Sequence, residues 1–168
     1  MIEGSGTNRT HPMSERIRNA LFNKIGDEVE GAVVLDAFAG SGALGLEALS
    51  RGAERVVLVE KDHVAQKVIA TNVKTLGVEK QSQLVKAPVA SWLATTEETF
   101  DIIFVDPPFH DMQLSTAMAL TKLLRPKGLM VLSYPGRGET PSELGVVVVD
   151  NRSYGDAALA FYRLDAPE

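Results

Sequence analysis

Residues 36–45 have the sequence DAFAGSGALG, which decides the fold prediction. Gly40, Gly42 and Gly45 have the Gly-x-Gly-x-x-Gly spacing, and an unbroken apolar run at 32–35 precedes them. Such a run predicts a buried strand, and the segment that follows the glycines predicts a helix. Glycines at a strand-to-helix turn let the backbone approach a ligand, and the helix N-terminus offers free N–H groups. The motif therefore predicts a ligand-binding loop, with a tight turn that binds no ligand as the alternative.

A second apolar run, at 55–59, ends at Glu60, about 20 residues after Gly40. A carboxylate at this place can accept hydrogen bonds from both hydroxyls of a ribose. The loop and Glu60 fit either a nicotinamide dinucleotide or S-adenosylmethionine. Asp36 favours S-adenosylmethionine, because it can face the cationic methionine end and would repel a pyrophosphate. We therefore predict that Asp36, Gly40, Gly42 and Glu60 bind S-adenosylmethionine.

Strand and helix patterns alternate along the rest of the chain. One helix is predicted from the N-cap Ser14 to Ile25, and a second from the glycine loop to Ser50. Two more helices are predicted at 63–76 and 113–124, and further strands at 83–85, 101–105 and 129–132. Helical crossovers between buried strands imply a parallel sheet. The last two runs, 145–149 and 157–164, are joined too closely for a helix, so they must pair antiparallel. The predicted fold class is α/β: a Rossmann-like class I S-adenosylmethionine-dependent methyltransferase fold with a seven-stranded, mostly parallel sheet and a C-terminal antiparallel hairpin.

The length of 168 residues and the composition fit one globular domain. We predict an extended arm at 1–13 and a single methyltransferase domain at 14–168. The chain has no cysteine and three scattered histidines, so no metal site is expected. No apolar run approaches the roughly 18–20 residues that span a bilayer, and no secretion signal is recognisable. A cytoplasmic protein without membrane contact is expected.

The formal net charge of −5 argues against binding of naked nucleic acid by charge alone. Basic residues outnumber acidic ones near the N-terminus, where Arg16 and Arg18 stand on the first predicted helix. This local excess could face phosphates, or it could be an ordinary solvated helix face.

Asp106-Pro107-Pro108-Phe109 follows the strand predicted at 101–105. An amine on an aromatic ring is a weak nucleophile, but Asp106 and the Pro107 carbonyl can accept its hydrogen bonds and localise its lone pair. Proline fixes the backbone, and Phe109 offers a flat face on which an extruded base can stack. We predict that the four residues catalyse methyl transfer to an exocyclic amine of a nucleic-acid base. The alternative is that the prolines merely end a strand and Phe109 packs in the core.

Four segments together resemble the bacterial 16S ribosomal RNA guanine-N2 methyltransferases of the RsmD type. They are residues 14–23, 36–52, 104–109 and 154–156, and the resemblance covers nearly the whole chain. It implies methylation of the N2 amine of one guanine in 16S ribosomal RNA, within the 30S subunit or an assembly intermediate. S-adenosylmethionine is the implied methyl donor, and a monomer is expected.

The resemblance also implies that Arg16 and Arg18 help to hold RNA, with a structural role for either equally open. Pro88 departs from the family pattern, because Asp or Asn usually stands there to meet the adenine amine of the donor. Ser133 and Tyr134 stand where a glutamate is common, which leaves substrate recognition on that side open.

Three other functions fit parts of the sequence. Another amino-group methyltransferase, acting on DNA adenine or cytosine or on a protein glutamine, would share the second motif. An NAD-dependent oxidoreductase would share the glycine loop. A non-catalytic ribosome assembly factor could use the same fold without activity.

Overall fold

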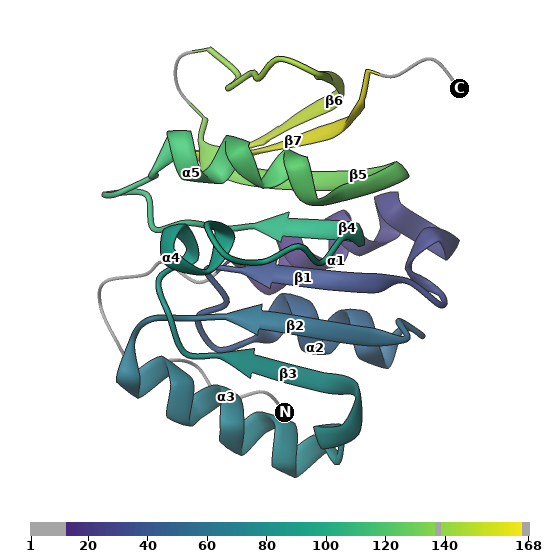
Figure 1. Cartoon of the computed structure of the whole chain (residues 1–168). Helices are drawn as coiled ribbons and strands as arrows, with labels where there is room; N and C mark the ends of the chain where they lie inside the picture. Colours follow the sequence, from purple (N-terminus) through teal and green to yellow (C-terminus); the bar gives the residue numbers. More distant parts are fainter. Residues whose placement is uncertain (1–12, 137–138, 166–168) are drawn as a thin grey trace.

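The computed structural model describes residues 13–136 and 139–165. Within these residues seven strands form one sheet in the order β3-β2-β1-β4-β5-β7-β6 (Figure 1). The strands are β1 (Val33–Ala37), β2 (Arg55–Val59), β3 (Ser82–Val85), β4 (Phe100–Val105), β5 (Leu124–Pro135), β6 (Val146–Tyr154) and β7 (Ala157–Leu164). The first five pair in parallel, whereas β7 pairs antiparallel with both β5 and β6. The predicted fold class is confirmed.

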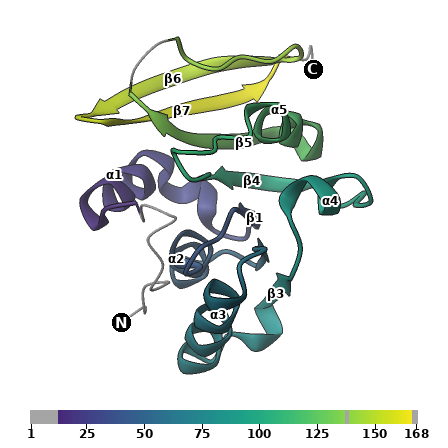
Figure 2. The same cartoon turned by 90° about the vertical axis from the view of Figure 1, so that its left-hand side faces the viewer.

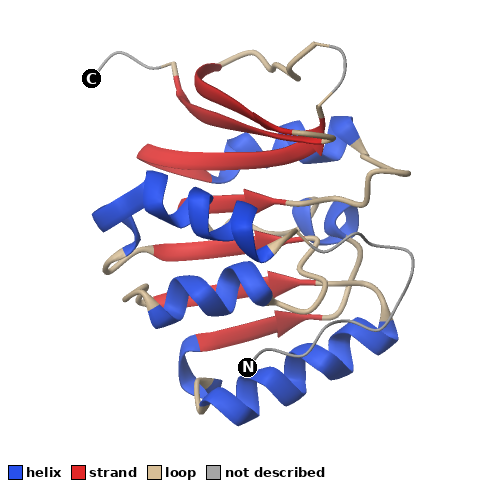
Figure 3. Cartoon of the chain, turned by 180° about the vertical axis from the view of Figure 1, so that it is seen from behind, coloured by secondary structure: helices blue, strands red, loops and turns tan. Residues whose placement is uncertain are grey.

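Helices cover both faces of the sheet. They are α1 (Glu15–Ile25), α2 (Ala43–Ser50), α3 (His63–Leu76), α4 (Val89–Leu93) and α5 (Leu114–Ala119), with short 3-10 turns η1 (Gly26–Val29), η2 (Glu79–Gln81) and η3 (Leu120–Leu123). Apolar residues of α1, α2 and α3 pack on one face, and those of α4, α5 and η3 on the other. Figure 2 shows the sheet from the carboxyl ends of its parallel strands, with α1 and α2 on one side and α4 and α5 on the other. Figure 3 shows the face that carries α1, α2 and α3.

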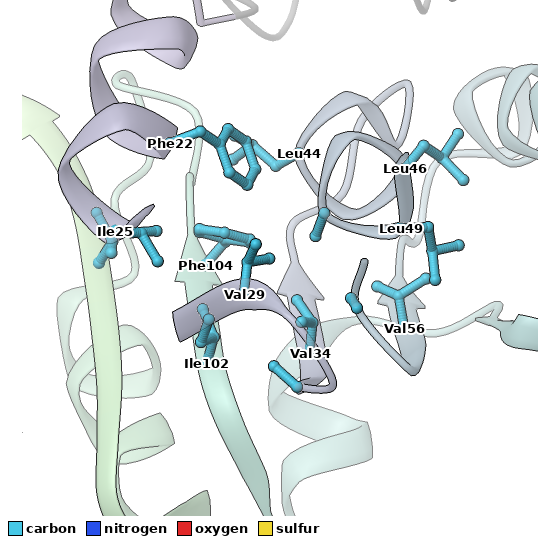
Figure 4. Close-up of a cluster of buried hydrophobic side chains, with 14 of the residues drawn as sticks. Phe22, Ile25, Val29, Val34, Leu44, Leu46, Leu49, Val56, Ile102 and Phe104 are labelled. Atoms are coloured by element: carbon cyan, nitrogen blue, oxygen red, sulfur yellow. The ribbon is translucent and has the colours of Figure 1, made fainter. Parts of the chain in front are cut away.

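The core on the α1 face is built from alternate strand residues, because successive side chains of a strand point to opposite faces. Phe22 of α1 lies edge-on against Phe104 of β4, with ring centroids 5.5 Å apart. Figure 4 shows Phe22 and Phe104 with Leu44 of α2 and Val34 of β1 around them. Since α1 contributes to this core, it is part of the folded sheet assembly and not a loose appendage.

The first helix begins where the sequence predicts. The Ile17 N–H donates a hydrogen bond to the Ser14 side-chain oxygen at 3.1 Å, which caps the helix. Residues 1–12, most of the predicted arm, lie outside the described residues. None of the helices in the described part of the chain is long and apolar enough to cross a membrane.

Two strands, β5 and β6, are longer than predicted by several residues. The segment 125–128, which lies between a predicted helix and a predicted strand, is part of β5. Phe100 pairs with Leu124 and Ile102 with Leu129, so β5 has extra residues opposite β4 and the pairing is irregular there. Strand β6 continues past residue 149 to Tyr154, because a strand exposed on both sides can carry polar residues that sequence patterns assign to loops. Strand β6 lies at the edge of the sheet and pairs only with β7.

Candidate active site

A cleft lies at the carboxyl ends of the parallel strands, where open α/β sheets bind ligands. Its empty space, counted with the open mouth and the solvent in it, is about 720 Å³. Its lining residues come from the loops after β1, β2, β3 and β4: Phe38, Gly40, Val59, Glu60, Lys61, Asp62, Ala65, Pro88, Val89, Pro108, His110, Asp111 and Gln113. The cleft therefore brings together Gly40 and Glu60 from the first predicted motif and Pro108 from the second.

The glycine loop turns sharply between β1 and α2. Phe38, Gly40 and Gly42 have φ values of 59°, 59° and 84°, in the left-handed region that glycine adopts without strain. Gly40 has open space where a side chain would stand, as a ligand-facing position requires. Gly42 instead packs inward, since a Cβ there would lie 3.2 Å from Leu58. Of the two predicted donor-binding glycines, only Gly40 lines the cleft.

Glu60 is buried at the end of β2 and fixes the loop opposite it. Its Oε1 accepts a hydrogen bond from the Gly40 N–H at 2.8 Å, and its Oε2 accepts one from the Asp62 N–H at 2.9 Å. The Gln66 side chain donates to the Glu60 carbonyl at 2.8 Å. The Glu60 carboxylate thus ties the loop after β1 to the start of α3, and its predicted contact with a ribose stays a prediction.

Asp36 lies beneath the loop, fully buried, and does not belong to the residues that line the cleft. Its Oδ2 accepts a hydrogen bond from the Gly45 N–H in α2 at 2.9 Å. Burial raises the pKa of this carboxyl well above its usual value; the Gly45 N–H opposes the shift, and the nearby charges of Asp106 and Glu60 add to it. The described contact of Asp36 is structural, and its predicted role in donor binding stays a prediction.

The Asp106 carboxyl group follows β4 on the same face of the sheet as Asp36. Burial raises the pKa of Asp106 to about 7, and a hydrogen bond from the Ser133 hydroxyl partly offsets that rise. A carboxyl group with this pKa can exchange a proton near neutral pH, as a general base requires.

The other residues of the motif lie at different depths. Pro107 is buried, whereas Pro108 and Phe109 are half-buried. Pro108 lines the cleft, and its carbonyl accepts a hydrogen bond from the Asp111 N–H at 3.0 Å, which fixes the turn after the motif. Asp106, Pro107 and Phe109 are not among the residues that line the cleft in the described part of the chain.

Sequence reasoning missed several residues of the cleft. The sequence assigned no role to His110, Asp111 or Gln113, but all three line it. Gln113 has a φ of 47°, unusual for a residue other than glycine, and its amide nitrogen lies 3.5 Å from an Asp111 oxygen. These residues directly follow the second motif, and that position was the signal in the sequence that could have placed them near the site. Which of their side chains face the cleft depends on the shape of the loop, which the sequence pattern does not give.

The two arginines predicted to hold RNA lie on α1, away from the cleft lining. Arg16 is exposed. Arg18 has a side chain only 17% exposed and lies 3.7 Å from Glu47 and 3.9 Å from Glu15. Arg16 is therefore free to meet a partner surface, whereas Arg18 ties α1 to α2.

No group of three or more potential metal-ligating side chains (His, Cys, Asp or Glu) occurs in the described parts of the chain, 13–136 and 139–165. The polar side chains that line the cleft are those of Glu60, Lys61, Asp62, His110, Asp111 and Gln113. These groups suit hydrogen bonding to an organic ligand.

Comparison with known proteins shows the family. A family model described as "Conserved hypothetical protein 95" matches residues 2–163. The Bacillus subtilis protein YlbH, described as a candidate rRNA methyltransferase, is 35% identical over 161 residues, which cover 92% of this chain and 88% of that protein. Ribosomal RNA small subunit methyltransferase D of Escherichia coli is 42% identical over 99 residues, but these span only 59% of this chain and 50% of that relative.

A solved structure supports the same relationship. The Escherichia coli protein yhhF, described as a candidate methyltransferase, superimposes with a TM-score of 0.86 at 30% sequence identity. The superposition covers 96% of this chain and 91% of that one. The chain therefore belongs to the RsmD-type family of small-subunit ribosomal RNA methyltransferases.

Proposed function

We propose that this chain transfers a methyl group from S-adenosylmethionine to the N2 amine of a guanine in 16S ribosomal RNA. The observation that carries the proposal is the cleft that joins Gly40 and Glu60 to Pro108, near the half-buried carboxyl group of Asp106. Membership of a family of small-subunit ribosomal RNA methyltransferases supports the RNA substrate. The guanine N2 target rests on the resemblance of residues 104–109 to the guanine-N2 enzymes.

The chemistry of the cleft lining suits the methyl donor. Gly40 leaves open space at its Cα, and Phe38, Val89 and Pro88 offer apolar surface for an adenine ring. Pro88 has no side-chain acceptor for the adenine amine, so recognition of that amine would fall to backbone groups or to another wall of the cleft. When bound, S-adenosylmethionine supplies an electrophilic methyl group on a sulfonium centre.

Asp106 and Pro107 would prepare the amine for attack. A guanine N2 lone pair is delocalised into the ring, and hydrogen bonds from its N–H groups to the Asp106 carboxylate and the Pro107 carbonyl localise it on nitrogen. The amine must lose a proton once it has been methylated, and the Asp106 carboxylate can take that proton. Phe109 would stack on the base that has been turned out of the RNA.

Arg16 would contact RNA phosphates from α1, since Asp106 lies on the face of the sheet that α1 covers. Arg18 would hold α1 against α2 through Glu47 and so orient that contact. The reaction would take place in the cytoplasm on a 30S subunit or an assembly intermediate, with the enzyme as a monomer.

The test is direct detection of the methylated nucleoside. The protein is incubated with methyl-labelled S-adenosylmethionine and 30S subunits from cells that lack this methylation, and the RNA is digested to nucleosides for mass spectrometry. N2-methylguanosine should form with the wild type, and the rate should fall about a hundredfold or more with Asp106→Ala. Glu79→Ala, which removes an exposed carboxylate on η2, is the matched control and should keep the wild-type rate.

Two outcomes would overturn the proposal. Label on adenosine, cytidine or protein would leave an amino-group methyltransferase with another substrate. Unchanged turnover in Asp106→Ala would remove that carboxylate from the mechanism.

A further inference from the structure

Ser133 stands in β5 at a place where its side chain meets the end of β4. Val105 of β4 pairs with Leu132 of β5 in parallel register, so the next residues, Asp106 and Ser133, are neighbours. Phe104 and Val131 belong to the core on the α1 face, and side chains alternate along each strand. Asp106 and Ser133, two residues further on, therefore lie on that same face.

The nearest residues of the sheet on the same face as Ser133 include apolar core residues. Ser133 is only 5% exposed, and its direct partner on β7 is Leu159, a core residue. Val131, which precedes it on the same face, is also a core residue. A buried hydroxyl without a hydrogen-bond partner would be destabilising, and the strand register places the Asp106 carboxyl group where it can be that partner.

We propose that Ser133 is a positioning residue whose hydroxyl donates a hydrogen bond to one carboxylate oxygen of Asp106 and leaves the other oxygen for the amine of the bound base. The inference rests on the proposed function for its catalytic consequence. It gives a role to a position where the family commonly has a glutamate. A glutamate beside Asp106 would add a second carboxylate, whereas a serine adds a donor that favours the charged form of Asp106.

Other charged groups on this face are already engaged with one another. The negative charge of Asp106 raises the pKa of Asp36 on β1. The charge of Glu60, the residue after β2, also raises the pKa of Asp36. On α1, Arg18 lies near Glu47 and Lys24 pairs with Asp150 at 2.7 Å. The hydrogen bond from Ser133 lowers the pKa of Asp106 and so favours its charged form, whereas burial favours the neutral form.

The experiment compares Ser133→Ala and Ser133→Thr with the wild type in the full-length protein. Ser82→Ala is the matched control. Ser82 begins β3, which is separated from β4 by two strands in the sheet order, and its hydroxyl donates a hydrogen bond to the Val78 carbonyl. Titration of the Asp106 carboxyl carbon is followed by NMR in the protein alone, with Asp106→Asn used to assign the signal. In parallel, kcat and KM on 30S subunits are measured from about pH 5.5 to 9.

We expect the Asp106 titration and the acidic limb of kcat to move upward together by about one pH unit in Ser133→Ala. That shift is a tenfold change in proton affinity, or about 1.4 kcal/mol. KM for the subunit should stay near the wild-type value, and Ser133→Thr should restore the wild-type profile because it keeps the hydroxyl. If Ser133→Ala fails to fold, Ser133→Cys offers a similar volume with a much weaker donor and gives the same comparison.

An Asp106 titration that does not move in Ser133→Ala overturns this inference, whatever the activity. Wild-type turnover in Asp106→Ala would instead overturn the proposed catalytic role of Asp106. The NMR measurement needs neither donor nor RNA, so the two failures are distinguishable.

Discussion

At the scale of single residues, the proposed reaction places two opposed demands on Asp106. It has to be buried to exclude water from the reacting amine, and it has to be charged to accept hydrogen bonds from that amine. Burial raises its pKa to about 7, and Ser133 opposes the rise. The result is a carboxyl group that is partly charged at neutral pH.

The first prediction concerns the pH dependence of activity. Below about pH 7 Asp106 binds a proton and loses its ability to accept hydrogen bonds from the amine, so the rate should fall as the pH is lowered through this value. A profile of kcat against pH checks this expectation. Asp106→Asn should abolish the inflection, and an inflection that persists in this variant would assign it to another group.

The second prediction concerns stability. The pKa of Asp106 in the folded protein, about 7, is above the unfolded value of 3.8, so folding favours the protonated form. Stability from this group is fully present below about pH 4 and is lost as the pH rises through 7. Asp106→Asn should therefore raise the free energy of unfolding at pH 8 by on the order of 3 kcal/mol.

Urea denaturation at pH 5 and pH 8 measures that difference, with exposed Asp165→Asn as the control. A variant less stable than the wild type at pH 8 would mean that the Asp106 carboxylate is stabilised by contacts stronger than its desolvation.

The third prediction separates two glycines of the same motif. Gly45→Ala places a Cβ 2.8 Å from Val56, inside a packed core, and should lower the free energy of unfolding by about 1–3 kcal/mol. Gly40→Ala meets no atom within 4 Å but lies in the cleft at a φ of 59°, so it should weaken donor binding more than it lowers stability. Thermal unfolding and calorimetric titration with S-adenosylmethionine compare the two variants. Equal loss of donor affinity in both would remove the distinction.

The sequence predicts where the motifs lie, but it does not predict which contacts their residues make. Gly40, Glu60 and Pro108 were placed at strand ends, and the structure brings them into one cleft. The contacts of Glu60 with the Gly40 and Asp62 amides depend on the dihedral angles of two loops, which periodicity does not encode. The inward packing of Gly42 is likewise a matter of the distance between α2 and the sheet.

At the scale of elements, α1 joins the core to the predicted RNA-binding surface. Phe22 packs against Phe104, the residue two positions before Asp106 on β4. The amphipathic pattern of this helix predicted its existence and its cap from sequence. The short helix α4 was not predicted, because five residues after Pro88 carry too few periodic positions to distinguish a helix from a loop.

The fourth prediction distinguishes the two arginines of α1. Arg16→Ala removes an exposed side chain, so it should weaken RNA binding without changing stability. Arg18→Ala removes a largely buried side chain beside Glu47 and should lower the free energy of unfolding by about 1 kcal/mol. Filter binding with 16S ribosomal RNA and thermal unfolding measure the two effects. The same loss of RNA binding in Arg18→Ala, with unchanged stability, would give Arg18 a direct contact.

At the scale of the whole molecule, the net charge of −5 has to be reconciled with an RNA substrate. A protein that binds RNA through few cations gains little from counterion release, whereas a ribosomal particle also offers protein surfaces. One continuous seven-stranded sheet supports the prediction of a single domain at 14–168, which stays a prediction for the residues outside the described ranges.

The fifth prediction follows from this charge. Methylation of 30S subunits should be faster than methylation of free 16S ribosomal RNA by about tenfold or more at physiological salt. Initial rates on both substrates, measured over a range of salt concentrations, test the expectation. A higher rate on free RNA at every salt concentration would show that the particle contributes no binding energy.

The position of β7 has a consequence for the order in which the sheet can be completed during synthesis. Strand β7 follows β6 along the chain but lies between β5 and β6 in space. While a ribosome is making this chain, β6 emerges before its sole partner, and the outer edge of β5 stays open until residues 157–164 have left the exit tunnel. Ser133 pairs with Leu159 across that edge, so the strand that covers Ser133 arrives only when β7 is inserted. A nascent chain that ends before β7 would therefore leave the β5 edge next to Ser133 unpaired, even if its first five strands had already folded.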